Sequence, residues 1–194
     1  MEKIKTYLIH WIGPFVDPNK VKDLELKLSK EFYPDSNDKF VFELYLLKGK
    51  IPYAKKSSYY CGESLKQEGA GKRLKNDKHH INDYDVIEEI WAGYISNIEP
   101  ISKDVFAAEK IITAYLKDEV GEGYILNETN KKFPKYDICI VNRWYKHDSV
   151  TIWEKLKQGS PSKIIPSILL HYTYGKEHEI FGSERIKRLK YIVE

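Results

Sequence analysis

The sequence predicts an α+β fold, with a small mixed or antiparallel sheet flanked by helices. Segments with strand character and segments with helical periodicity follow one another irregularly, without repeated strand–helix–strand units. The 194 residues suffice for one domain with additions at its ends, and the hydrophobic fraction of 42% supplies a core. We therefore expect a central core, residues 39–130, with an elaboration on either side.

The N-terminal elaboration, residues 1–38, is expected to be a strand followed by a helix. Residues 6–12 are apolar and partly β-branched or aromatic, which is typical of a strand. Asp17 and Pro18 then provide an N-cap and a proline at the first helical position. Apolar residues recur after them at helical spacing, and Pro34 ends the helix.

The central segment combines predicted strands with two predicted helices. Alternating apolar residues or aromatic runs predict strands over residues 39–48, 57–62 and 86–96. A helix over residues 65–76 is weakened by its glycines. A stronger helix begins at Ser102 or Asp104 and ends near Lys117, because apolar residues recur along one face.

The C-terminal elaboration, residues 131–194, carries no recognised motif and is expected to pack on the core. It contains predicted strands over residues 136–141 and 164–174, the second interrupted by Pro166, and a short helix over residues 150–156. The basic segment 185–190 fits helix or strand equally well.

Neither a membrane span nor a secretory leader is expected. No run approaches the roughly 20 apolar residues of a membrane helix. The N-terminal apolar stretch is short and lacks a small-residue cleavage site, so it is interpreted as a strand. The chain has only two cysteines, Cys61 and Cys139, which favours a reducing compartment and predicts a cytoplasmic location.

Positive charge is concentrated in one segment, although the whole chain has a net charge of only +3. Residues 48–78 contain nine Lys or Arg and three acids. Such a segment is either a phosphate-binding face or a solvated loop and helix surface. The candidate nucleic-acid contacts within it are Lys55, Lys56, Lys72, Lys75, Lys78 and His79.

Several common catalytic motifs are absent from the sequence. It has no P-loop, no glycine-rich dinucleotide fingerprint, no zinc spacing of Cys and His, and no G-x-S-x-G elbow. Cys61 with His79 or His80 as its base would make a nucleophile, but a buried structural cysteine is the more common situation. These absences direct attention to other polar residues in the middle of the chain.

Five polar residues follow one another on successive predicted elements: Tyr45, Tyr60, Arg73, Glu109 and Asn127. The two tyrosines lie in the tripeptides Glu-Leu-Tyr and Tyr-Cys-Gly. This order resembles the GIY-YIG nuclease superfamily, in which two strand tyrosines are followed by a helical Arg, a Glu on a later helix and an Asn. The resemblance covers residues 40–130, a little under half of the chain.

The resemblance implies a metal-dependent endonuclease that hydrolyses phosphodiester bonds in DNA. Glu109 would hold Mg²⁺ or Mn²⁺, and Arg73 would neutralise the phosphate. Tyr60 would accept a proton from water or orient it, given a phenol pKa lowered by neighbouring cations. Tyr45 would share the hydrogen-bond network, and Asn127 would support the geometry. Stand-alone restriction or phage-defence nucleases of this superfamily are the expected relatives, and a homodimer is expected for cutting both strands.

The sequence departs from the family pattern in two places, and two alternatives follow. The first motif lacks its Gly and Ile, and the position four residues after the Arg, often His in the family, is Asp77. His79 or His80 would reach the site only if this segment is not a regular helix. One alternative is a catalytically silent relative that only binds nucleic acid. The other is an interaction protein that binds a protein partner through its Tyr and Trp residues.

Overall fold

The computed structural model describes residues 4–64, 68–76, 79–127, 133–147, 164–174 and 177–183. Its strands are β1 (Lys5–Phe15), β2 (Leu44–Lys50), β3 (Ser58–Glu63), β4 (Val86–Ile95), β5 (Ile138–Lys146), β6 (Ile168–Tyr174) and β7 (Glu177–Gly182). Its helices are α1 (Pro18–Phe32), α2 (Gly69–Arg73) and α3 (Ser102–Val120), with short 3₁₀ turns η1 (His80–Asp83) and η2 (Glu122–Tyr124).

The seven strands form one mixed sheet in the order β3-β2-β4-β1-β5-β6-β7. All neighbouring strands are antiparallel except β1 and β5, which run parallel. The predicted α+β class is confirmed. The sheet is larger than the small sheet expected, because β1, β5, β6 and β7 extend it beyond the central segment.

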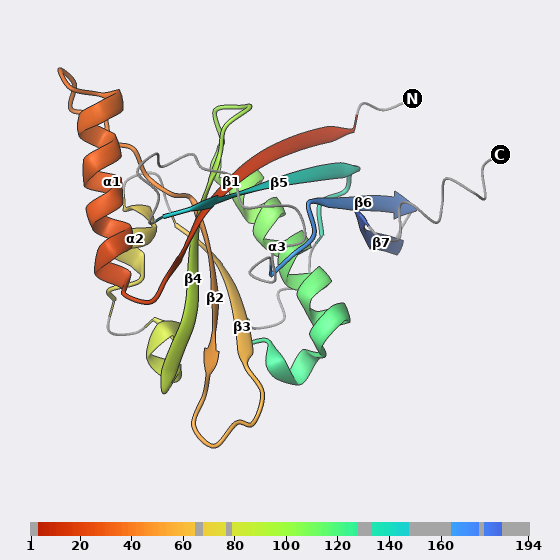
Figure 1. The fold of residues 1–194 in the computed structure, drawn as a ribbon. Coiled ribbons are helices and arrows are strands. Elements are labelled where there is room, and N and C mark those ends of the chain that lie inside the picture. Colours follow the sequence, from red (N-terminus) through yellow and green to blue (C-terminus); the bar gives the residue numbers. More distant parts are fainter. Residues whose placement is uncertain are drawn as a thin grey trace.

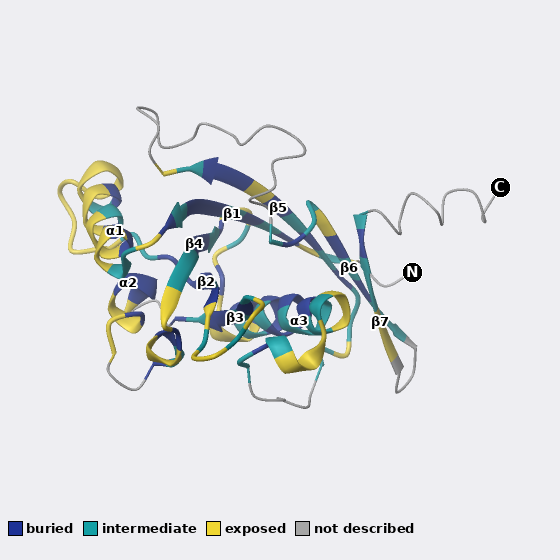
Figure 2. Ribbon diagram, turned by 60° about the horizontal axis from the view of Figure 1, so that its bottom comes forward, coloured by how far each residue is buried: buried dark blue, intermediate teal, exposed yellow. Residues whose placement is uncertain are grey.

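Helices cover the two faces of the sheet unequally. The sheet curls around α3, which lies against one face, whereas α1 and α2 lie against the other face (Figures 1 and 2). One buried cluster, which includes Trp11, Trp91 and Ile111, lies on the α3 side. A second cluster, which includes Leu28 and Phe42, lies on the side of α1 and α2. The apolar pattern of each strand is therefore divided between two cores.

The two helices with strong periodicity, α1 and α3, are confirmed. Asp17 caps α1 as predicted, since its side chain accepts a hydrogen bond of 2.8 Å from the amide of Asn19. Strand β2 begins at Leu44, five residues later than the alternation predicted. Residues before it bond to side chains instead of a neighbouring strand, because the amide of Phe40 donates to Ser29 Oγ and that of Phe42 to Glu25.

Helix α2 is a single short turn of helix held against α1 by close backbone packing. Gly69 has φ of +70°, a conformation that glycine adopts without strain. A Cβ on Gly71 would lie 2.5 Å from the Cα of Lys22, so only glycine allows this approach. The buried carboxylate of Glu25 accepts hydrogen bonds from the amides of Phe42 and Gly71. The glycines that weaken the helix in isolation are thus what lets it dock.

We expect Glu25→Gln to remove part of the pH dependence of stability. Burial raises the pKa of Glu25 to about 7, against backbone hydrogen bonds that lower it. Because the folded state binds this proton more tightly than the unfolded state, stability falls as pH rises from about 4.5 to 7, by about 3 kcal/mol from this group. Urea unfolding across this window should be flatter in the variant than in the wild type. An unchanged slope would contradict the assignment.

The C-terminal part contributes three strands to the sheet. β5 and β6 are confirmed, with β6 beginning two residues after Pro166, while β7 was not predicted. The predicted helix over residues 150–156 and the segment 185–190 lie outside the described residues. Among the described residues, no helix combines the length and apolar character needed to cross a membrane.

Candidate active site

Tyr45 and Tyr60 lie on neighbouring antiparallel strands at one edge of the sheet. Tyr45 of β2 pairs with Gly62 of β3, and Leu47 pairs with Tyr60, so the two tyrosines are diagonal neighbours on one face. Their rings stack with centroids 6.0 Å apart. The two motif tyrosines are therefore brought together by the strand register.

Gly62 provides the space that the Tyr45 ring occupies. A Cβ at this position would lie 2.3 Å from both Cζ and Oη of Tyr45, which no side chain tolerates. The Tyr45 side chain is fully buried, so its ring has no free direction in which to move. The physical role of the glycine in Tyr-Cys-Gly is thus to accept the tyrosine of the partner strand.

His79 holds the hydroxyl of Tyr45 in place through a hydrogen bond. Its Nδ1 accepts a hydrogen bond from the amide of Ile81, so the neutral ring carries its proton on Nε2. Nε2 lies 2.7 Å from Tyr45 Oη and donates to it. Burial, with the nearby charge of Arg73, lowers the pKa of His79 to about 4, which keeps the ring neutral.

The structure assigns His79 a different place from the one expected. His79 was a candidate nucleic-acid contact, but its side chain is only 6% exposed and lies against both tyrosines. The described residues that follow Arg73 do not continue the helix, because α2 ends at Arg73 and residues 74–76 are not helical. This break is the condition under which the shifted histidine can reach the site.

The hydroxyl of Tyr45 affects the proton affinity of Tyr60. Since Tyr45 accepts a hydrogen bond from His79, its own proton is left available on the side of Tyr60, and the Tyr45 hydroxyl lowers the pKa of Tyr60. Burial has the larger effect and leaves the pKa of Tyr60 raised, with Glu109 adding to the increase and Arg73 opposing it. The expected lowering of this pKa is therefore not produced by the protein's own side chains.

Arg73, at the C-terminal end of α2, is exposed beside the two tyrosines. Its charge lowers the pKa of Tyr45 and Tyr60, although burial of both phenols outweighs it. The same charge lowers the pKa of Glu63, which burial raises overall. Arg73 thus presents a guanidinium to solvent at the margin of the tyrosine cluster, where an anion is accessible to it.

Glu109 and Asn127 approach the tyrosines around the outer edge of β3. Asn127 Oδ1 accepts from the amide of Cys61 at 2.9 Å, and its Nδ2 donates to the carbonyl of Cys61. The same Nδ2 lies 3.4 Å from Glu109 Oε1. Glu109 comes from α3, on the opposite face, and is close enough to raise the pKa of Tyr60. All five residues of the predicted series therefore gather at this edge.

Glu63 belongs to the same cluster and was missed by the sequence reasoning. It lies at the end of β3, and its charge raises the pKa of Glu109. Burial is the larger cause, and together they raise the pKa of Glu109 to about 7. The available signal was a carboxylate immediately after the Tyr-Cys-Gly motif.

The donor set suits a cation that keeps most of its water. Within the described residues, no group of three or more His, Cys, Asp or Glu is placed to hold a metal ion. Mg²⁺ commonly binds through one or two carboxylates and completes its shell with water and phosphate oxygens. Glu109, with Glu63 beside it, matches that arrangement because the mutual repulsion of the two carboxylates is relieved by a cation.

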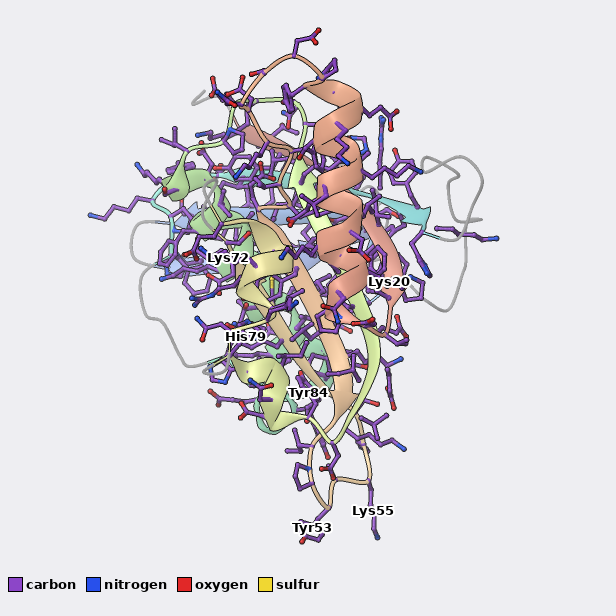
Figure 3. The ribbon with its side chains drawn as sticks, turned by 90° about the vertical axis from the view of Figure 1, so that its left-hand side faces the viewer. Lys20, Tyr53, Lys55, Lys72, His79 and Tyr84 are labelled. Carbon is purple, nitrogen blue, oxygen red and sulfur yellow. The ribbon has the colours of Figure 1, made fainter. Side chains whose placement is uncertain are left out.

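Exposed cations extend from Arg73 across two helices. A groove of about 270 Å³ is lined by Arg73, Lys72, Lys75 and Lys22, with Glu68 and Asn76. Figure 3 shows Lys72 on α2 beside α1, and Lys55 at the tip of the β2–β3 hairpin. The predicted contacts Lys55, Lys56, Lys72 and Lys75 are all exposed, whereas Lys78 lies outside the described residues. Lys22 was not predicted, because it precedes the basic segment by 26 residues.

Cys61 does not form a nucleophilic pair with either histidine. Its side chain is fully buried in the cluster on the α3 side, whereas His79 lies on the side of α1 and α2. Burial raises the pKa of the thiol well above its usual value. The more common situation, a structural cysteine, is confirmed.

Family models, curated proteins and solved structures were each compared with the chain, and none of them matches it. Function is therefore inferred from the residues of the site and their geometry.

Proposed function

We propose that the protein is a metal-dependent endonuclease that hydrolyses phosphodiester bonds in DNA, with a GIY-YIG-like site. One observation carries the proposal: Tyr45 and Asn127, 82 residues apart in the sequence, and the residues between them converge on the edge of one strand. Phosphodiester hydrolysis needs an activated water and neutralisation of the charge that develops on the phosphoryl oxygens, and a phenol, a guanidinium and a metal-binding carboxylate can together provide both. A restriction or phage-defence role is the biological setting we propose.

In this mechanism Tyr60 would act as the phenolate, its own proton having passed to solvent when a bound cation lowers its pKa, and would orient the attacking water and accept its proton. His79 donates to Tyr45, and the Tyr45 hydroxyl, on the ring stacked against Tyr60, would donate to the Tyr60 phenolate and stabilise its negative charge. Arg73 binds the phosphoryl oxygens in fork geometry and neutralises their developing charge. Tyr45 thus acts through Tyr60 as a positioning residue.

Glu109 would hold the divalent cation, Mg²⁺ or Mn²⁺, with Asn127 fixing the carboxylate. When bound, the cation would supply positive charge that lowers the pKa of nearby acids and stabilises the negative charge that develops on the phosphoryl oxygens. Burial and the charge of Glu63 raise the pKa of Glu109, and the opposing charge of Lys110 does not offset them. Cutting both strands requires two such sites, so we propose a homodimer on DNA.

The groove between α1 and α2 is the proposed path of the DNA backbone away from the site. We expect Lys22→Ala and Lys72→Ala each to weaken binding of any DNA sequence and to lower the slope of log affinity against log salt by about one unit. Each lysine would release one counterion equivalent on contacting a phosphate. Fluorescence anisotropy at several salt concentrations measures both effects.

Lys27→Ala is the matched control for that experiment, since Lys27 is an exposed lysine of α1 that does not line the groove. It should leave both the affinity and the salt slope unchanged. Equal losses for Lys27 and Lys22 would contradict a defined path and indicate nonspecific attraction.

A second candidate is a relative that binds nucleic acid without cutting it. The raised pKa of Tyr60 and the replacement of the family's Gly and Ile by Glu43 and Leu44 favour it. Plasmid and linear DNA incubated with Mg²⁺, Mn²⁺ or EDTA distinguish the two functions. Metal-dependent cutting supports the nuclease, whereas tight, salt-sensitive binding without cutting supports the binding protein.

A further inference from the structure

Tyr53 stands at the tip of the hairpin that joins β2 and β3, with its side chain fully in solvent. Its relative exposure is 103%, so the ring contributes no buried surface to the fold (Figure 3). The turn is closed by a hydrogen bond of 3.1 Å from the amide of Ala54 to the carbonyl of Ile51. Pro52 and Tyr53 are the two central residues of this turn, and Pro52 precedes the tyrosine as in a type II turn.

The backbone at Tyr53 has a conformation that tyrosine adopts at a cost. Its φ is +64°, and it is the single non-glycine residue with positive φ in the described part of the chain. The corresponding turn position usually carries glycine or asparagine, because a Cβ is unfavourable there. A large aromatic ring is therefore kept at a strained position where it packs against nothing. Strain without a packing gain points to a role outside the fold.

The lysines around the Tyr53 ring favour an anionic partner. Residues 48–62 contain four lysines and no acid. Lys50, Lys55 and Lys56 are exposed around the tip, whereas Lys48, nearer the sheet, pairs with Glu89 at 2.8 Å. The Lys56 ammonium lies over the Tyr124 ring, 5.3 Å from its centroid, which leaves Lys50 and Lys55 as the exposed cations nearest the ring. A flat aromatic face flanked by exposed cations matches a base and its neighbouring phosphates. An acidic protein surface would satisfy the lysines but offers no equivalent for the exposed ring.

The hairpin also connects this tip to the candidate active site. Strand β2 carries Tyr45 toward the loop, and β3 returns with Tyr60, so the tip projects from the two strands that hold both tyrosines. A nucleic acid bound at Arg73 and extending along the hairpin would reach the tip through its neighbouring nucleotides.

We propose that Tyr53 stacks on an unpaired or opened base of the bound DNA, with Lys55 on a flanking phosphate. The inference rests on the proposed function insofar as the substrate is DNA. It adds a preference for DNA with an accessible base, such as a single strand, a bulge or a mismatch.

The test compares variants of Tyr53 by anisotropy on a paired duplex and on the same duplex with one bulged base. Tyr53→Ala should weaken binding of the bulged duplex by about five- to a hundredfold, the range expected for loss of one base–aromatic stack. Tyr53→Phe should bind within about twofold of the wild type. Because stacking is not ionic, the loss in Tyr53→Ala should persist at high salt, whereas the loss in Lys55→Ala should shrink.

Tyr53→Gly separates the effect of the strained backbone on stability from the effect of the aromatic ring on binding. Glycine relieves the positive φ, so its Tm should rise by about 2–4 °C while binding falls as in Tyr53→Ala. Tyr33→Ala, which removes a partly exposed tyrosine at the far end of α1, is the matched control and should bind normally.

The outcomes distinguish this inference from the proposed function. Binding of both duplexes by Tyr53→Ala with wild-type affinity overturns the stacking role even if the enzyme cuts DNA. Weakened binding in a protein that never cuts DNA supports the stacking role and overturns the nuclease. A wild-type protein that binds no nucleic acid at low salt overturns both.

Discussion

Glu109→Gln should lower the rate of metal-dependent DNA cleavage by about a thousandfold or more. Removing the carboxylate that would hold the cation forfeits several kcal/mol of charge stabilisation, and each 1.36 kcal/mol is about tenfold in rate. Glutamine preserves the shape and keeps an oxygen that accepts from Asn127. Single-turnover cleavage at saturating protein, with Mg²⁺ or Mn²⁺, measures the loss of chemistry separately from binding.

The unfolding temperature provides the control for this variant, because it shows whether the folded state is intact. Burial and Glu63 raise the pKa of Glu109 to about 7, so stability falls as pH rises from about 4.5 to 7. Above that window Glu109→Gln should therefore unfold at a higher temperature than the wild type without metal. Mg²⁺ should raise the Tm of the wild type and not of the variant. A folded variant that still cuts DNA would refute the role of Glu109 in holding the cation. A variant that unfolds more readily than the wild type would contradict the predicted gain in stability.

Gly62→Ala should destabilise the protein by about 1–3 kcal/mol and remove most of its cleavage activity. The added methyl would meet Cζ and Oη of Tyr45 at 2.3 Å. Tyr45 is fully buried, stacked on Tyr60 and bonded to His79, so the strain falls on these contacts. Urea unfolding and single-turnover cleavage at saturating protein measure the two effects.

Gly123→Ala is the matched substitution, because a Cβ at that position has no neighbour within 4 Å. It should leave stability within about 0.5 kcal/mol of the wild type and activity unchanged. If Gly62→Ala behaves like Gly123→Ala, the close packing of Tyr45 on β3 is not what positions the tyrosine pair.

The sequence order was sufficient to single out five residues that lie near one edge of the sheet in the structure, but not their neighbours. Tyr45, Tyr60 and Glu109 were found because each falls on a separate predicted element. Glu63 was not predicted, because a carboxylate at the end of a strand is common and gains a possible role only when α3 places Glu109 near it. Lys22 was not predicted, because only the packing of α1 on α2 brings it into the same groove as Arg73.

His79 shows why local pattern was insufficient. Its distance along the chain from Arg73 does not fit a regular helix, and a histidine in a basic segment suggests a surface contact. In the structure the helix ends early, and the ring turns inward to Tyr45. This position of the ring depends on tertiary packing, in which Glu25 and the glycines of α2 hold that helix against α1.

The sequence by itself determined the α+β class, the two periodic helices and most strands, because hydrophobic spacing reports directly on which face of an element is buried. The extent of the sheet was decided by tertiary structure: β1 is placed between β4 and β5 by hydrogen bonds between residues distant in the chain. The site was divided in the same way. Residue types indicated the chemistry that we propose, while strand register and the bonding of Asn127 along the outer edge of β3 decided which side chains meet.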